Sequence, residues 1–293
     1  MFESIGRSFE ITKQSFNVVK QDKELLLFPI LAAFFSMIYI IALIFPVIFT
    51  DIIASLIGKE AFAIAEYAIY FVVYLGLSVI ATFFNVCVVY TAKKRFEGGN
   101  SGVGEAIGFA FSRIHLIFLW GIVSATVGLI LRLIESVTEN AGAAGKLIGQ
   151  IIVAILGGAW GIMTLFVVPA MVYDGLCPKG AIAKSLQVLS KTWGESLVRY
   201  FALGFAQAAF IILGIILGII LIVVVAPIMP VLTLVILLLM VIYFVMVVLV
   251  FQILNSIFNT ALYVYADKGI IPSAYSQETL QGAFKSNKKK SMF

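Results

Sequence analysis

The longest uncharged segment constrains this chain most. Between Arg199 and Asp267 lie 67 consecutive residues without Asp, Glu, Lys or Arg. Three further uncharged runs cover residues 25–50, 67–92 and 147–173. Each run exceeds the roughly 20 apolar residues that a helix needs to cross the hydrocarbon core of a bilayer. The chain is therefore expected to be an integral membrane protein with an all-α fold.

The composition supports this interpretation. Hydrophobic residues make up 62% of the 293 residues and charged residues 12%, against about 25% charged residues in a soluble domain. The net charge of +5 is carried by residues next to the apolar runs, where anionic headgroups attract them. Nucleic acid is therefore not an expected partner. Two cysteines are too few for a disulfide framework.

The apolar pattern predicts six transmembrane helices in a single domain over residues 1–272. Their expected limits are 25–49, 64–92, 114–134, 147–173, 198–225 and 231–262. The last two come from the 67-residue run, which Pro227 and Pro230 divide at a tight turn. The sixth helix is longer than an ordinary bilayer requires. The sequence leaves open whether this hairpin spans fully, tilts or projects outward.

Basic residues indicate the orientation. Seventeen of the 20 lysines and arginines lie in the N-terminal segment, in the loops after the second and fourth predicted helices, or in the C-terminal tail. Only Lys59, Arg132 and Lys146 lie on the opposite side. Cytoplasmic loops carry the excess of basic residues. The sequence therefore predicts a multi-pass protein of the cell membrane with both termini in the cytoplasm.

An amphipathic helix is expected over residues 1–24, lying in the cytoplasmic interface. One stripe recurs at alternating spacings of three and four residues and is apolar at five of its six positions: Phe2, Ile5, Phe9, Thr12, Phe16 and Val19. Short amphipathic stretches at 101–111 and 180–189 precede the third and fifth spans in the same way. The pattern fits three repeated units of one interfacial helix and one hairpin, although such elbows also recur without duplication.

Polar side chains inside the predicted spans provide one candidate site. Gln252, Asn255 and Asn259 share a face of the sixth helix, and Asn85 lies in the second. Together they would form a small polar site or a water pocket. The favoured alternative is hydrogen bonding that fixes the second and sixth helices together.

Small residues provide a second candidate surface, on the fourth helix. Gly149, Gly157 and Gly161 belong to one series with four-residue spacing, which lets helix backbones approach closely. This surface would pair two copies of the chain, or, in the favoured alternative, pack helices within one subunit.

The tail over residues 273–293 is basic and is expected in the cytoplasm. Its lysines either bind anionic lipid headgroups or only follow the general bias of charge toward that side: Lys285, Lys288, Lys289 and Lys290.

No catalytic, cofactor-binding or metal-binding motif is recognisable, and the single histidine, His115, lacks a partner in the sequence. The chain is predicted not to be an enzyme and to need no cofactor. We expect a scaffold or accessory subunit that organises lipids or partner membrane proteins, including other copies of itself. The alternative is a transporter or channel for a small or amphiphilic solute. No charge lies in the middle of a predicted span, which argues against an ion-coupled carrier.

Several short motifs carry a resemblance to a known family: residues 22–25, 28–29, 84–85, 124–128, 159–160, 166–169, 181–185, 192–194 and 262–266. The chain resembles, over nearly its whole length, a prokaryotic family of multi-pass membrane proteins catalogued only as a domain of unknown function. It is more loosely similar to the membrane domains associated with glycerophosphodiester phosphodiesterases, although a phosphodiesterase domain is missing. The resemblance implies a six-helix fold and no catalytic residue.

Overall fold

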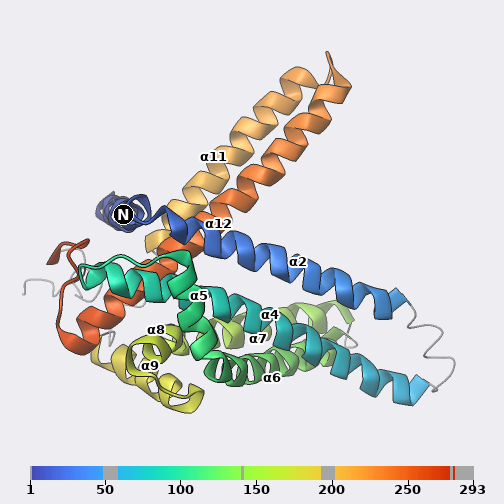
Figure 1. The fold of residues 1–293 in the computed structure, drawn as a ribbon. Coiled ribbons are helices and arrows are strands. Elements are labelled where there is room, and N and C mark those ends of the chain that lie inside the picture. The colour runs from blue at the N-terminus through green and yellow to red at the C-terminus, as the bar shows by residue number, and fades with distance from the viewer. Residues whose placement is uncertain (1, 49–58, 140–141, 193–201, 278–279, 281–293) are drawn as a thin grey trace, which may run out of the picture. The chain divides into compact units, whose positions relative to one another are not determined.

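The computed structural model describes residues 2–48, 59–139, 142–192, 202–277 and 280, most of them helical. Figure 1 shows the α-helices, and a short 3-10 helix, η1, lies between the first two. In chain order they are α1 (Phe2–Gln21), η1 (Lys23–Leu26), α2 (Leu27–Ile48), α4 (Lys59–Phe96), α5 (Val103–Ser112), α6 (Ile114–Glu139), α7 (Gly142–Met163), α8 (Val167–Asp174), α9 (Pro178–Thr192), α11 (Ala202–Val225) and α12 (Pro230–Lys268). The described ranges contain no strand and include six helical segments long and apolar enough to cross a membrane. The predicted all-α fold with six candidate spans is confirmed.

The helices follow the predicted limits, but two are longer. The second and sixth predicted spans lie within α4, of 38 residues, and α12, of 39 residues. At 1.5 Å per residue these helices measure roughly 57–59 Å, about twice the thickness of a bilayer's hydrocarbon core. Charged residues occupy both ends of α4 but only the C-terminal end of α12. Residues 49 and 198–201 of the predicted first and fifth spans lie outside the described residues.

The predicted fourth span lies within the candidate span Gly142–Asp174, in which a turn at residues 164–166 separates two helices. α7 ends at Met163, and α8 begins at Val167 after a turn in which the Val167 N–H donates to the Thr164 carbonyl at 3.0 Å. Pro169 explains the break, because a proline in the helix interior lacks an N–H and clashes with the preceding turn. As the third residue of α8, it occupies a position whose N–H has no partner within the helix.

The packing groups the described residues into two compact units. The first, which we call the hairpin unit, comprises residues 1–26, 94–100 and 190–293. The second, the bundle unit, comprises residues 27–93 and 101–189. The prediction of a single domain over residues 1–272 was based on composition alone and did not address this division.

In the hairpin unit, α11 and α12 form an antiparallel pair, and α1 contacts both (Figure 1). A turn joins the two helices, with the N–H groups of Ile228 and Met229 donating to the Val225 carbonyl at 3.0 and 2.8 Å. Pro230 begins α12, where its fixed φ suits the first turn and its missing N–H costs nothing. The predicted turn between the fifth and sixth spans is therefore confirmed.

In the bundle unit, side-chain contacts join α2 to α4, α4 to α6 and α6 to α7. The Tyr39 hydroxyl of α2 donates to the Val72 carbonyl of α4 at 2.6 Å. Gly121 of α6 approaches α4 so closely that a Cβ there would lie within 3.0 Å of Val79. Trp120 of α6 stacks on Trp160 of α7 with ring centroids 5.8 Å apart. Flat aromatic and small residues thus allow the close packing that associates helices in lipid.

The short helices α5 and α9 match the predicted amphipathic stretches before the third and fifth spans. α5 packs on the end of α4, where the Tyr90 and Phe109 rings stack 4.2 Å apart. In α9, the buried Ser185 hydroxyl accepts a hydrogen bond from the Phe166 N–H at 3.2 Å. That contact satisfies a backbone donor at the start of α8, where the helix itself offers no acceptor.

Candidate functional site

The polar residues proposed from the sequence fall into the two separate units. Gln252, Asn255 and Asn259 lie on one face of α12 in the hairpin unit, with Gln252 exposed and the two asparagines half-buried. Asn85 lies half-buried on α4 in the bundle unit. The structure thus brings three of the four residues onto one helix face. A joint site with Asn85 stays a prediction.

Polar contacts in the bundle unit gather at two levels. At one level, the Tyr90 hydroxyl donates to Glu105 at 2.6 Å, and the Lys93 ammonium lies 4.9 Å from the centre of the Tyr173 ring.

At the other level, four side chains form a network. The Tyr70 hydroxyl donates to Glu66 at 2.8 Å, and Arg132 pairs with Glu135 at 2.9 Å. The Arg132 guanidinium also lies 5.7 Å from the centre of the Tyr70 ring. Such aromatic and charged pairs are typical of the membrane–water interface.

The separation of these two levels matches a bilayer. On α4, Tyr70 and Tyr90 are 20 residues apart. Arg113, which directly precedes α6, and Arg132 on α6 are 19 residues apart. Both intervals correspond to roughly 30 Å of helix, the thickness of the hydrocarbon core. Within these intervals the helices carry no Asp, Glu, Lys or Arg, so the two arginines lie at opposite ends of an apolar interval.

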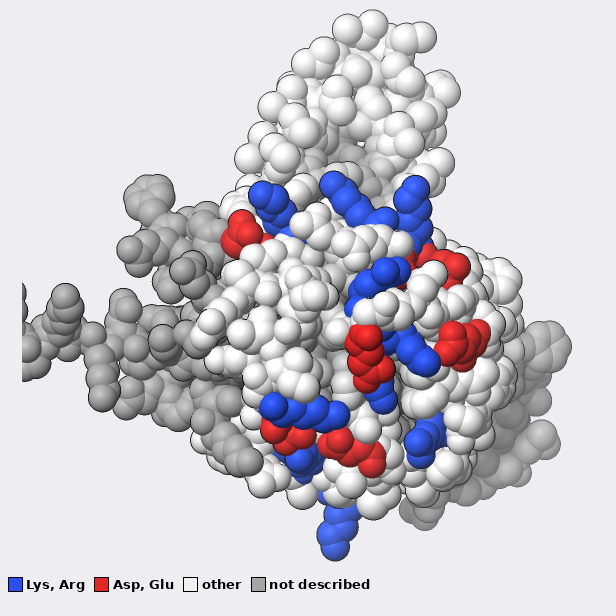
Figure 2. Space-filling view, turned by 60° about the vertical axis from the view of Figure 1, so that its left-hand side comes forward, with Lys and Arg blue, Asp and Glu red and all other residues white. Residues whose placement is uncertain are grey.

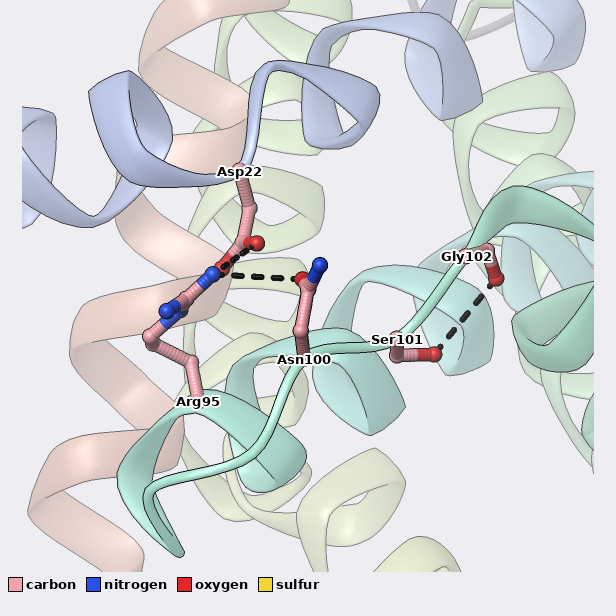
Figure 3. A network of polar contacts seen from close by, with 5 residues as sticks. All are labelled: Asp22, Arg95, Asn100, Ser101 and Gly102. Carbon is pink, nitrogen blue, oxygen red and sulfur yellow. Dashed lines mark hydrogen bonds and ion pairs between the residues drawn. The ribbon is translucent and has the colours of Figure 1, made fainter.

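A partly buried ion pair joins Asp22 and Arg95 in the hairpin unit (Figure 3). Asp22 follows the last residue of α1 and is 5% exposed. The Arg95 guanidinium, in the last turn of α4, donates hydrogen bonds to both carboxylate oxygens of Asp22, and the bond from Nε measures 2.5 Å. Arg95 also donates to the Asn100 side chain at 3.2 Å. A paired arginine with its fork of donors holds a carboxylate in fixed geometry, so this contact ties the end of α1 to the end of α4.

α1 has two different faces. Its buried stripe consists of Ile11, Ser15 and Val18, within about 60° around the helix. The Ser15 hydroxyl shares a hydrogen bond of 2.7 Å with the buried Tyr275 hydroxyl. Phe9 and Phe16 lie on the opposite side and are 49% and 40% exposed. Two residues of the predicted stripe therefore lie on the outer face of the helix, while the side chains of Phe2 and Ile5 lie outside the described residues.

One residue of the predicted stripe, Val19, is an exception because it is buried at 2% exposure. It lies at the boundary of the two faces, about 80° around the helix from Ile11.

The glycine surface on α7 is divided. At Gly149 a Cβ would overlap the Thr138 side chain of α6, and at Gly157 the nearest neighbour would be Leu131 of α6 at 3.8 Å. At Gly161 a Cβ would meet no described atom within 4 Å. The first two glycines thus lie against α6 of the same chain, and the choice between the two alternatives stays a prediction.

The structure does not describe the four predicted lysines of the C-terminal tail. Lys285, Lys288, Lys289 and Lys290 lie outside the described residues. Within the described ranges, no three His, Cys, Asp or Glu side chains come close enough together to hold a metal ion.

Comparison with known families matches residues 63–272 to the model of a family described as a family of unknown function, DUF6159. The chain belongs to this family. The matched part of DUF6159 begins within α4 and ends after α12, so it covers five of the six candidate spans. The expected membership of an unknown-function family is confirmed. The description of DUF6159 names no activity that could be assigned to the chain. The search of curated proteins finds no match. The looser similarity to domains associated with phosphodiesterases is not shown.

The Asp22–Arg95 pair and the buried stripe of α1 were not predicted from the sequence. Asp22 lies three residues before the uncharged run 25–50, and Arg95 lies three residues after the uncharged run 67–92. This shared position was the signal that could have suggested the pair. For the buried stripe, Ile11 and Val18 at a seven-residue interval were the corresponding signal.

Proposed function

We propose that this DUF6159 protein is a non-enzymatic membrane protein that organises lipids or partner membrane proteins, as a scaffold or accessory subunit. The outward surface of the α11–α12 hairpin carries the proposal. From Leu203 to Ala266 the hairpin has no charged residue, and Figure 2 shows its outer part as an uncharged white surface.

Large apolar side chains cover the outer surface of the hairpin. On both helices, residues such as Ile216, Ile220 and Leu238 are at least 50% exposed. On α11 the described buried residues are Leu203 and Ala206 near its start and two glycines that face α12. An apolar surface of this extent on a membrane hairpin has to be covered by acyl chains or by another apolar helix. Lipids and membrane proteins are therefore the expected partners.

The polar contacts support a scaffold more than an ion-coupled transporter. In the bundle unit the ion pair and the tyrosine–carboxylate contacts lie near the ends of the apolar intervals. Ionisable groups that carry protons or ions through a membrane lie within the spans and mark the pathway. The rival function, transport of a small or amphiphilic solute, would depend on Asn85, Asn255 and Asn259.

The location follows from the same physical argument. The proposed site of action is the cell membrane, with both termini in the cytoplasm, because 17 of the 20 basic residues lie on one predicted side. The lysines of the C-terminal tail would add electrostatic attraction to anionic lipid on that side.

The test is to extract the full chain from its native membrane in polymer-bounded nanodiscs and determine which lipids and subunits accompany it. A scaffold predicts a fixed subunit stoichiometry or enrichment of particular lipids relative to the bulk membrane. The double variant Ile216→Gln and Ile220→Gln should lose that enrichment. Ile155→Gln on the exposed face of α7 (65% exposed) is the matched control and should retain it.

The opposite outcome is also defined. A monomer surrounded by bulk lipid would contradict the scaffold function. Proteoliposome flux of a solute that disappears in Asn255→Leu and Asn259→Leu would favour the transporter instead.

A further inference from the structure

Residues 9–20 of α1 include an alternating row of aromatic and basic residues on the outward side of the helix. Phe9, Lys13, Phe16 and Lys20 follow each other at spacings of four, three and four residues, so they share one helix face. All four are exposed, and the Lys20 ammonium lies 5.3 Å from the centre of the Phe16 ring. We call these four residues the Phe–Lys row.

The Phe–Lys row is held outward by contacts on the opposite side of the helix. The stripe of Ile11, Ser15 and Val18 is buried, and α1 contacts α11 and α12. The Ser15–Tyr275 hydrogen bond and the Asp22–Arg95 pair fix α1 at two further points. The helix is therefore presented in a defined rotation rather than lying free on a surface.

The sequence next to α1 indicates its level along the membrane normal. Asp22, directly after α1, lies three residues before the uncharged run 25–50, which is long enough to cross the roughly 30 Å hydrocarbon core. The C-terminal end of α1 is therefore expected in the headgroup layer outside that core.

The chemistry of the Phe–Lys row fits the anionic side of that layer. Phenylalanine rings enter the boundary between headgroups and acyl chains, and lysine stems extend so that their ammonium groups reach phosphates. The acidic residue nearest in sequence, Glu10, lies on another face, where it accepts a hydrogen bond from Gln14 at 2.9 Å. The basic charge of the row is thus available to a negatively charged ligand.

We propose that α1 binds anionic phospholipid through the Phe–Lys row, with both rings in the acyl boundary and both ammonium groups on lipid phosphates. This inference rests on the proposed membrane location and specifies the class of lipid that the protein organises. Each lysine is expected to contribute about a fivefold preference for anionic over zwitterionic lipid.

The first experiment measures where the Phe–Lys row lies. Single cysteines at Phe9 and Phe16, with Asn17 as the matched control on the polar face, are labelled with an environment-sensitive dye in full-length protein carrying Cys177→Ser. The protein is placed in nanodiscs of phosphatidylcholine with phosphatidylglycerol, some lipids carrying a quencher near the headgroup. Labels at 9 and 16 should be quenched by the lipid and the label at 17 by aqueous iodide.

Two results overturn this placement. Labels at 9 and 16 that only iodide reaches would mean that the row faces water. Labels that neither quencher reaches would mean that a protein covers it. In both cases the protein still requires a bilayer or detergent for solubility, so the proposed membrane function survives. Recovery of soluble protein without either would remove both proposals.

The second experiment measures the lipid preference. Native mass spectrometry of the full chain in detergent, titrated with phosphatidylglycerol or phosphatidylcholine, gives the ratio of the two dissociation constants. Lys13→Gln and Lys20→Gln should each lower that ratio about fivefold, and the double variant about 25-fold. The exposed Lys268, at the end of α12, provides the control Lys268→Gln, which should leave it nearly unchanged. An unchanged ratio in the double variant would overturn the anionic-lipid proposal.

Discussion

Gly214 on α11 is predicted to control the stability of the hairpin. A Cβ at this position would lie less than 3.0 Å from Cε1 and Cδ1 of Tyr243, whereas packed carbons lie about 3.5–4.0 Å apart. The Tyr243 ring cannot move away freely, because its hydroxyl donates to the Phe210 carbonyl at 2.8 Å. Gly214→Ala therefore forces the ring and the hydrogen bond to move together.

The expected cost follows from three contributions. Overpacking a close contact costs about 1–3 kcal/mol, and loss of the Tyr243 hydrogen bond adds about 1 kcal/mol. Alanine offsets about 1 kcal/mol of this through its higher helix propensity. The net prediction for Gly214→Ala is a loss of about 1–3 kcal/mol in the free energy of unfolding.

Gly218 is the matched control one turn further along α11. A Cβ there would also lie less than 3.0 Å from a neighbour, but the neighbour is the end of the Met240 side chain. Methionine has three rotatable bonds and adapts to irregular space. Gly218→Ala should therefore be nearly neutral, with the small cost of moving Met240 offset by helix propensity.

The assay is reversible unfolding of full-length protein in mixed micelles of increasing SDS fraction, combined with amide hydrogen exchange across α11 and α12. Gly214→Ala should shift the transition and raise exchange in the hairpin, and Gly218→Ala should do neither. In the double variant Gly214→Ala/Tyr243→Leu, the alanine should cost less than in the wild type. Equal stability of the two alanine variants would refute the argument from packing.

Three further predictions concern buried polar contacts. Ser185→Ala leaves the buried Phe166 N–H without its acceptor and should cost about 1–3 kcal/mol; the same SDS titration measures it, and wild-type stability would contradict the assigned bond. Asp22→Asn removes the negative charge that pairs with Arg95 and should lower the free energy of unfolding by about 2 kcal/mol, less than for a fully buried pair because Arg95 is partly exposed. Amide hydrogen exchange in α1 should then accelerate about 30-fold. Unchanged exchange would exclude the anchoring role of the pair. Burial raises the pKa of Tyr275 above the value near 10 in unfolded chains. Above about pH 10 the native state therefore keeps a proton that the unfolded state releases. The free energy of unfolding should fall as the pH rises further. In Tyr275→Phe the stability between pH 8 and pH 11 should fall less than in wild type, and parallel pH profiles would count against the buried phenol.

The sequence predicted the features that depend on composition and local pattern. The uncharged run between Arg199 and Asp267 located the long hairpin, and its two prolines located the turn. Charge is expensive in lipid, so its absence over more than 20 residues is a strong signal. The helical character of the first 21 residues was likewise evident from their spacing.

Features that depend on contacts between distant residues were not predictable in this way. Asp22 and Arg95 are 73 residues apart, and nothing in their local sequences required them to meet. On α1, the polar Ser15 lies in the middle of the buried stripe and interrupted its apolar pattern. Only the partner hydroxyl of Tyr275, 260 residues away in the chain, explains how Ser15 can be buried.

The α7–α8 break shows the limit of hydropathy. Residues 147–173 are uncharged throughout, and an uninterrupted apolar run was interpreted as one helix. Pro169 lies within this run, and hydropathy does not register the helix turn that it favours. The polar partner that stabilises the break, Ser185, belongs to another helix.

The uncharged helices are expected to cross the bilayer, with both chain ends in the cytoplasm. Single cysteines at Ile228, in the hairpin turn, and at Glu97, after α4, test this arrangement in a Cys177→Ser background. In intact cells a membrane-impermeant maleimide should label the cysteine at 228 and should reach the one at 97 only after permeabilisation. Labelling of both positions from outside, or of 97 alone, would contradict the account.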